Sequence, residues 1–203
     1  YPNYIQIVAS ADSGIKTLAD LKGKSVSVGA PKSGTELNAR AILEAAGMTY
    51  DDLGKVEYLP FAESVELMKN RQIDATLQSA GLGVASLKDL STSIPMTVVT
   101  VPTEVTDKLG APYIAAEIPA GTYDGQTESV PTVAVINYLI TSDAVSDDVA
   151  YAMTKSMFEN LDEMKAAHSA ANDIDAQKAL LGMPVPVHPG AQKYYDEVGV
   201  KAE

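Results

Sequence analysis

Val26-Ser-Val-Gly-Ala-Pro-Lys-Ser-Gly-Thr-Glu-Leu37 joins a short alternating strand to a helix through a tight turn that contains glycine and proline. Ser33 is suited to cap the helix, and Glu36 completes a capping-box pattern. The predicted helix runs to about Ala46 and stops at Gly47. Such a loop directs backbone N–H groups and the positive end of a helix dipole at one point, which favours an anion. An ordinary capped helix without a ligand is the alternative.

The residue types in this loop restrict the anion. Gly29 and Gly34 have the glycine spacing of a phosphate-binding P-loop, but the next residue is Thr35 where that motif requires lysine. Nucleotide binding is therefore disfavoured. A carboxylate or another small anion, held by Ser33, Thr35 and the local N–H groups, agrees better with the sequence.

Composition excludes several classes of function. The 203 residues carry a formal net charge of −12, which argues against nucleic acid and anionic membrane surfaces as partners. Without cysteine, there are no disulfides, thiolate nucleophiles or cysteine metal sites, and such a chain is compatible with a periplasm. His168 and His188 lie near no recognisable catalytic series, so we expect neither a transition-metal site nor a triad. A calcium site built from carboxylates stays open.

Strands and helices alternate along the first part of the chain. Predicted strands cover residues 4–10, 24–28, 56–61, 73–78, 96–101, 113–118 and 132–141, and predicted helices cover 34–46, 62–70, 84–90 and 104–109. This order indicates a parallel sheet, in which ligands bind beyond the carboxyl ends of the strands. We expect the segment Gln78-Ser-Ala-Gly81 to lie beside the loop of residues 33–35 at that edge.

The last third of the sequence is predicted to be helical. Ser146 is suited to cap a long helix that ends near Lys165, followed by shorter helices at 176–181 and 191–198. In the long helix, apolar residues recur at spacings of three and four: Val149, Met153, Met157, Leu161 and Met164. We expect this stripe to pack against a lobe, with its methionines filling a core.

Seven blocks of sequence resemble a known family. They are Ala11-Asp-Ser-Gly-Ile-Lys-Thr-Leu-Ala-Asp-Leu-Lys-Gly-Lys, Val28-Gly-Ala-Pro-Lys-Ser-Gly-Thr-Glu, Ile73-Asp-Ala, Ser79-Ala-Gly, Ile118-Pro-Ala-Gly-Thr-Tyr, Val130-Pro-Thr-Val-Ala-Val and Met183-Pro-Val-Pro-Val-His-Pro-Gly-Ala. In this order they resemble the TAXI solute-binding proteins, the extracytoplasmic receptors of tripartite ATP-independent periplasmic (TRAP) transporters. The similarity covers essentially the whole chain, but nothing here matches the N-terminal part of that family.

The resemblance implies an α/β fold of the type II periplasmic-binding-protein, or Venus flytrap, class. Residues 1–11 would be a hinge strand from the first lobe, and residues 12–130 would form the complete second lobe with a parallel-type sheet. Residues 131–203 would supply the return hinge strand and the C-terminal helices of the first lobe. The first lobe, and with it part of the ligand site, would then be incomplete in these residues.

The resemblance also implies a site in the cleft between the lobes. Ser33, Gly34 and Thr35 would bind a ligand carboxylate, with the next strand ends and the crossover loop alongside. The other residues expected to line the cleft are Phe61, Gln78, Ser79, Ala80, Gly81, Thr122 and Tyr123. Phe61 could equally belong to the core. Asn38 and Arg40 follow the loop, and we expect them to be surface or intrahelical residues.

The function implied is that of a periplasmic or extracytoplasmic receptor, not of an enzyme. It would bind a small carboxylate of the glutamate or glutamine type, use no cofactor or metal, and deliver the ligand to the membrane subunits of a TRAP transporter. Two alternatives share the scaffold. The effector-binding domain of a transcription regulator would need a DNA-binding segment elsewhere, and a transferase would need a catalytic acid, lysine or cysteine in the cleft.

Overall fold

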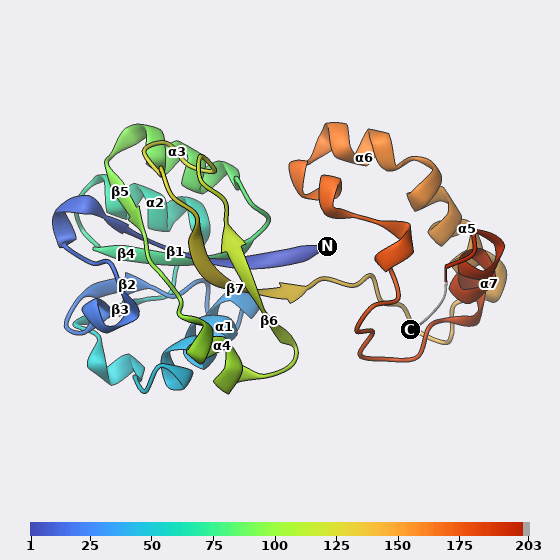
Figure 1. Ribbon diagram of the computed structural model, residues 1–203, viewed down its shortest axis with the longest axis horizontal. Helices are drawn as coiled ribbons and strands as arrows, with labels where there is room; N and C mark the ends of the chain where they lie inside the picture. The colour runs from blue at the N-terminus through green and yellow to red at the C-terminus, as the bar shows by residue number, and fades with distance from the viewer. Residues whose placement is uncertain (201–203) are drawn as a thin grey trace. The chain divides into compact units, whose positions relative to one another are not determined.

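The computed structural model describes residues 1–200, and their contacts divide into two units. The larger unit is Pro2–Ile136, and the smaller one contains Tyr1 and the residues from Asn137 onward. Figure 1 labels the sheet and helices α1–α4 in the larger unit and helices α5–α7 in the smaller one. Each unit is described by itself below. No helix within the described residues has the length and apolar character needed to cross a membrane.

The larger unit contains a mixed seven-stranded sheet with the order β3-β2-β4-β1-β7-β6, in which β5 also pairs with β1. Its strands are β1 (Pro2–Ser10), β2 (Ser25–Ser27), β3 (Lys55–Glu57), β4 (Ala75–Ala80), β5 (Met96–Val98), β6 (Tyr113–Ile118) and β7 (Val130–Ile136). As predicted, β2 runs parallel to both β3 and β4. The sheet is not parallel throughout, because β1 pairs antiparallel with β4, β5 and β7.

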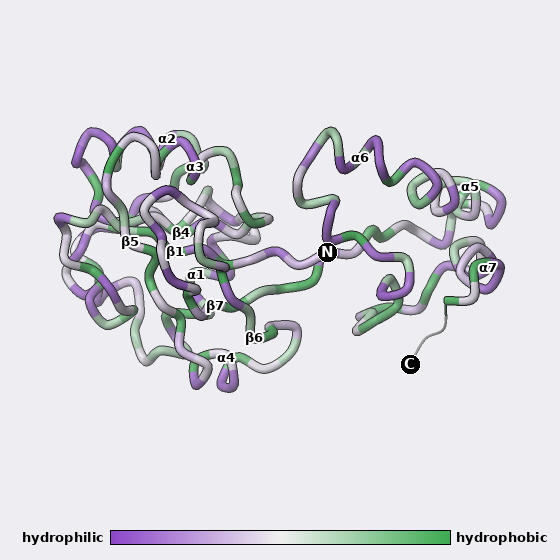
Figure 2. Tube along the Cα trace, turned by 45° about the horizontal axis from the view of Figure 1, so that its top comes forward, coloured by the Kyte–Doolittle hydropathy of each residue, from purple (hydrophilic) through white to green (hydrophobic). Residues whose placement is uncertain are grey.

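Helices cover both faces of this sheet. They are α1 (Gly34–Ala45), α2 (Phe61–Lys69), α3 (Ala85–Ser93) and α4 (Thr103–Leu109), with short 3-10 turns at Ala11–Ser13, Leu18–Leu21 and Tyr50–Asp52. Neighbouring residues of β1 serve opposite faces: Ile7 packs in the cluster that contains Ile42 of α1, and Val8 packs with Met68 of α2. The alternation of a strand therefore supplies two cores. Figure 2 shows hydrophobic residues in the strands of the sheet and also along the helices.

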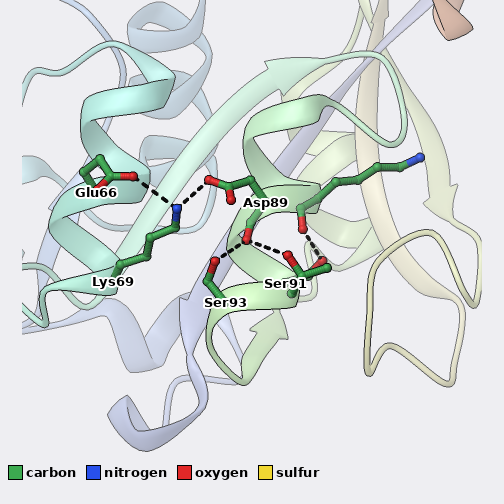
Figure 3. Close-up of polar contacts among 7 residues, drawn as sticks. Glu66, Lys69, Asp89, Ser91 and Ser93 are labelled. Atoms are coloured by element: carbon green, nitrogen blue, oxygen red, sulfur yellow. Dashed lines mark hydrogen bonds and ion pairs between the residues drawn. The ribbon is translucent and has the colours of Figure 1, made fainter.

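A lysine links the two helices on the second face. Lys69 at the end of α2 donates to the Glu66 carboxylate at 3.1 Å and to the Asp89 carboxylate of α3 at 2.5 Å, as Figure 3 shows. The hydroxyl of Ser93 returns to the Asp89 carbonyl at 2.7 Å and helps to end α3.

Several predicted boundaries differ from the structure. The strand predicted for 56–61 ends at Glu57, because Pro60 precedes the first turn of α2. The strand predicted for 132–141 ends at Ile136, which pairs with Pro2 at the start of β1. Both β1 and β7 lie in the sheet of the larger unit, and their assignment as hinge strands between two lobes stays a prediction.

The smaller unit consists of α5 (Asp147–Glu159), α6 (Leu161–Ala167) and α7 (Pro189–Glu197), with 3-10 turns at Ser169–Asp173 and Ala176–Lys178. Ser146 caps α5 as predicted, accepting a hydrogen bond from the N–H of Val149. The single helix predicted for 146–165 is wrong, because Asn160 leaves the helical region and separates α5 from α6. The helix predicted for 176–181 is only one 3-10 turn.

Aromatic side chains hold α5 and α7 together in the smaller unit. The rings of Phe158 and Tyr194 stack with centroids 5.9 Å apart, and Tyr151 meets Tyr194 edge to face. The predicted packing of the apolar stripe is not found within the described residues, where Met153 is 51% exposed and Met164 is 37% exposed. Met153 and Met164 therefore do not fill a core within the smaller unit.

Candidate functional site

Three loops of the larger unit meet at one edge of the sheet. Because β2, β3 and β4 are parallel, the loops that follow them leave from the same edge. These loops contain residues 28–33, 58–60 and 81–84. The antiparallel strand β1 begins at this edge, where Tyr4 pairs with Ala80. The predicted residues Ser33–Thr35, Phe61 and Ser79–Gly81 all belong to this edge.

The loop after β2 has a constrained backbone. The N–H of Ser33 donates to the Ala30 carbonyl at 3.1 Å across a turn, in which Lys32 adopts a φ of +60°. Gly29 has a φ of +96°, and a Cβ atom at this position would lie 2.6 Å from Cγ2 of Thr35. Only glycine fits here without displacing Thr35. The loop therefore fixes the direction in which the chain enters α1.

The first turn of α1 leaves hydrogen-bond donors open. The Ser33 hydroxyl caps the helix as predicted, accepting from the N–H of Glu36 at 3.2 Å. Within residues 1–200, the structure shows no acceptor for the N–H groups of Gly34 and Thr35 and no partner for the Thr35 hydroxyl. The first N–H groups of any helix lack intrahelical partners, so this arrangement suits an external oxygen acceptor.

The capping box suggested by the sequence is only half formed. The Glu36 carboxylate turns away from the cap and accepts from Arg40 at 2.6 Å and from the Tyr50 hydroxyl at 3.1 Å. The Arg40 guanidinium also lies 5.1 Å from the centroid of the Tyr50 ring. Burial, and then the charge of Glu36, raise the pKa of Tyr50 well above its usual value of 10.0. Arg40 is thus an intrahelical residue, as predicted, and it neutralises the one carboxylate beside the cap.

Asn38 joins α1 to the end of β4. Its Nδ2 donates to the Ser79 hydroxyl at 3.0 Å, and its Oδ1 accepts from the Tyr113 hydroxyl at 2.9 Å. The predicted neighbourhood of residues 78–81 and 33–35 is therefore confirmed. The expectation that Asn38 is a surface or intrahelical residue is wrong. No local signal in the sequence identifies the contact of Asn38 with Ser79, because the two residues are 41 positions apart.

Two predicted site residues lie beneath the edge. Gln78 is fully buried, its Oε1 accepts from the Ser86 hydroxyl at 2.6 Å, and its Nε2 has no partner within the described residues. Tyr123 is also buried, and its hydroxyl donates to Oε1 of Gln6. Burial raises the pKa of Tyr123 to about 12. Both side chains face the α3 side of the sheet and do not point into open solvent.

Thr122 and Phe61 occupy different surroundings. Thr122 is half-buried, and its hydroxyl donates to the Pro119 carbonyl at 2.7 Å. It lines a shallow hollow between α3 and residues 121–127, and none of the residues that line this hollow belongs to the loop after β2. Phe61 begins α2 at the edge and is half-buried. The described residues contain no group of three side chains suited to hold a metal ion.

The sequence profile of the NMT1-like family matches residues 1–199. The chain belongs to the NMT1-like family. Membership covers nearly all of the sequence, so both units described above are part of the NMT1-like domain.

Solved structures of binding proteins are similar to this NMT1-like chain. The periplasmic aliphatic sulphonate binding protein SsuA from Escherichia coli is 17% identical, with a TM-score of 0.44 over 96% of this chain and 55% of SsuA. An ancestral arginine-binding protein bound to arginine is 21% identical, with a TM-score of 0.36 over 66% of this chain and 47% of that protein. A histidine-bound substrate binding protein of an ABC uptake transporter from Streptococcus pneumoniae is 18% identical, with a TM-score of 0.39 over 66% and 45% of the two chains.

The α/β fold of the NMT1-like chain resembles that of type II periplasmic binding proteins over part of their length. The chain spans about half the length of the structures it matches. The ligands named for those structures are ligands of those proteins and are not assigned to this chain. The chemistry of this site rests on the residues of this chain.

Proposed function

We propose that this NMT1-like chain is the ligand-binding part of an extracytoplasmic solute receptor of the TAXI type. It binds a small carboxylate of the glutamate or glutamine type and presents it to the membrane subunits of a TRAP transporter. The seven sequence blocks that resemble TAXI receptors support the receptor class. The ligand class is supported by one observation above all, the open N–H groups of Gly34 and Thr35 beside the free Thr35 hydroxyl.

The charges around this point favour a carboxylate over a phosphate. Three neutral donors and the end of a helix dipole match one carboxylate group. A phosphate carries more charge and is normally met by lysine or arginine. Arg40 is engaged by Glu36 at 2.6 Å, which leaves Lys32 as the nearest cation along the chain. The site therefore suits a ligand with one negative group at this position.

The mechanism follows from the loops that meet at the edge. These loops contain three glycines, and Ser33, Lys32 and Tyr58 are their only residues with polar side chains. They offer no paired nucleophile and base, so the ligand is bound and released unchanged. Closure of a second lobe over the edge would exclude water from the carboxylate. The ligand shifts the balance between open and closed forms through its higher affinity for the closed form.

Titration calorimetry of the full-length protein tests this proposal. The probes are L-glutamate and its dimethyl ester, which differ in charge but share a carbon skeleton. We expect L-glutamate to bind and the ester to bind at least about tenfold more weakly, since charge-assisted hydrogen bonds are lost. Equal binding of the ester would contradict a carboxylate site. Conversion of glutamate to a new species, seen by mass spectrometry, would contradict the receptor mechanism.

A further inference from the structure

A buried glutamine holds the loop that follows β4. Gln6 is fully buried in the middle of β1, between two isoleucines of the opposite face. Its Nε2 donates to the carbonyl oxygens of Ala80 and Gly81, at 3.2 and 3.3 Å. A single side-chain amide thus takes up two successive backbone acceptors. A buried amide with both hydrogens engaged fixes the backbone that it contacts.

Tyr123 determines which way the Gln6 amide faces. Its hydroxyl donates to Oε1 of Gln6. The N–H groups of Gly83 and Val84 also interact with the Tyr123 oxygen and act to lower its pKa, although burial outweighs them. Because the Tyr123 hydroxyl holds Oε1 of Gln6, the Nε2 of the same amide faces the carbonyls of Ala80 and Gly81.

The geometry of the peptide group then sets the direction of the next N–H groups. In a trans peptide, the N–H points opposite to the preceding C=O. With the carbonyls of Ala80 and Gly81 turned toward Gln6, the N–H groups of Gly81 and Leu82 point away from it. Within residues 1–200 these two N–H groups have no acceptor. Since β4 lies between β1 and β2, they are directed to the side on which the loop after β2 leaves the sheet.

We infer that Gln6 and Tyr123 are positioning residues of the proposed carboxylate site. They keep the carbonyl oxygens of Ala80 and Gly81 away from the ligand, where those oxygens would repel a carboxylate. They leave the N–H groups of Gly81 and Leu82 free to donate to a ligand oxygen. Consecutive free N–H groups form an anion-binding concavity. This inference rests on the proposed function, and it places Tyr123 behind the loop and not against the ligand.

The first arm of the test needs no ligand. The backbone carbonyl ¹³C shifts of Ala80 and Gly81 report the hydrogen bonds that these oxygens accept. They are compared by NMR between the unaltered full-length protein and Tyr123→Phe, which lacks the hydroxyl that orients Gln6. Ser64→Ala is the matched control, because it removes a buried hydroxyl bonded to Ser27 from the same sheet face without touching this loop. We expect both carbonyl shifts to move in Tyr123→Phe and neither to move in Ser64→Ala.

The second arm adds L-glutamate as the probe. We expect the amide signals of Gly81, Leu82 and Thr35 to shift on binding to the unaltered protein. In Tyr123→Phe, the changes at Gly81 and Leu82 should shrink and affinity should fall about tenfold, the usual effect of losing one charge-assisted hydrogen bond. The change at Thr35 should persist at saturation. Gln6→Met, which is similar in length but has no donor for the carbonyls, should reproduce both effects.

The outcomes separate this inference from the proposed function. Unchanged carbonyl shifts in Tyr123→Phe would overturn the positioning role, whatever the ligand. Full amide changes at Gly81 and Leu82 in Tyr123→Phe would overturn it as well. Moved carbonyl shifts in a protein that shows no response to glutamate would support the positioning of the loop and refute the ligand class proposed above.

Discussion

The side chain of Asn38 donates to the hydroxyl of Ser79 at 3.0 Å, across 41 residues of sequence. The same amide accepts from the Tyr113 hydroxyl at 2.9 Å, across 75 residues. One polar side chain therefore joins α1, the end of β4 and the start of β6. Since the proposed ligand groups lie on the loops before α1 and after β4, this amide sets the spacing between them.

Replacing Asn38 by alanine removes both hydrogen bonds. We expect the free energy of unfolding to fall by about 1–3 kcal/mol, because Ser79 and Tyr113 lose a partner in partly buried positions. Affinity for L-glutamate should fall as the two loops separate. Tyr113→Phe is the matched control, since it breaks only the bond to β6 and keeps the one to Ser79. Calorimetry and urea denaturation measure both quantities, and equal affinity losses in the two variants would contradict the spacing role.

Thr35→Val tests the anion anchor directly. The substitution keeps the shape of the side chain but removes a hydroxyl that has no partner within the described residues. We expect affinity for a carboxylate to fall by about 1–3 kcal/mol with little change in stability, since a charge-assisted hydrogen bond is lost. Thr106→Val is the control, because the buried Thr106 hydroxyl in α4 also lacks a partner and lies outside the site. Unchanged calorimetric affinity would remove Thr35 from the site.

Gly29→Ala should disturb the same loop through the backbone. The new Cβ would lie 2.6 Å from Cγ2 of Thr35, at a φ of +96°. Gly47→Ala is the matched control, with a φ of +77° and nothing within 4 Å of the new atom. We expect Gly47→Ala to cost about 1 kcal/mol from backbone strain alone. Gly29→Ala should cost more and should also weaken ligand binding, which thermal unfolding and calorimetry would measure.

Local signals in the sequence predicted local structure correctly. Ser33 caps α1 because its hydroxyl meets an N–H only three residues away. The end of this helix, predicted at about Ala46 before Gly47, lies at Ala45 in the structure. Two residues that interact but lie far apart in the sequence produce no such local pattern. The partner of Asn38 at Ser79 and the antiparallel pairing of β1 depend on the register of the sheet, which periodicity does not specify.

The buried polar residues of the candidate site show the same limit. Gln6 interrupts an apolar strand, and a polar residue at an alternating position is normally read as solvent-facing. It is buried because Tyr123, 117 residues away, and the end of β4 satisfy its amide. The resemblance placed Tyr123 near the site but did not distinguish contact with the ligand from support of a loop. That distinction needed the hydrogen bonds of the folded chain.

Alkaline pH should destabilise the larger unit partly through Tyr123. Burial raises its pKa from 10.0 to about 12, whereas the unfolded chain ionises near the usual value. Between these values the unfolded state binds fewer protons than the native state, so stability falls as pH rises. The part of the unfolding free energy that depends on the ionisation of Tyr123 is fully present below about pH 10. It amounts to about 2–3 kcal/mol, at about 1.4 kcal/mol for each unit of pKa shift.

Tyr123→Phe should therefore lose less stability than the unaltered protein above pH 10, because phenylalanine has no proton to lose. Tyr50 and Tyr113 also have raised pKa values, so the stability of every variant should depend on alkaline pH. The effect of Tyr123 is therefore the difference between the pH dependence of the variant and that of the unaltered protein. Ser64→Ala provides the control, because a serine hydroxyl does not titrate and shifts stability equally at each pH. Parallel urea-denaturation curves for Tyr123→Phe and the unaltered protein across this range would contradict the burial argument.

The apolar residues of the smaller unit should cause self-association of the 203-residue chain. Within the described residues, Leu139 and Ile140 are each 70% exposed, and Val149 and Met153 are about half exposed. Exposed apolar patches of this kind mark surfaces that another chain or lobe covers. We expect sedimentation to show association at micromolar concentration and Met153→Lys to reduce it. Leu37→Lys is the matched control, since Leu37 is 58% exposed but stands alone on α1 of the larger unit. A chain that sediments as a monomer at all concentrations, or an equal effect of the two substitutions, would show that the stripe on α5 is not an interaction surface.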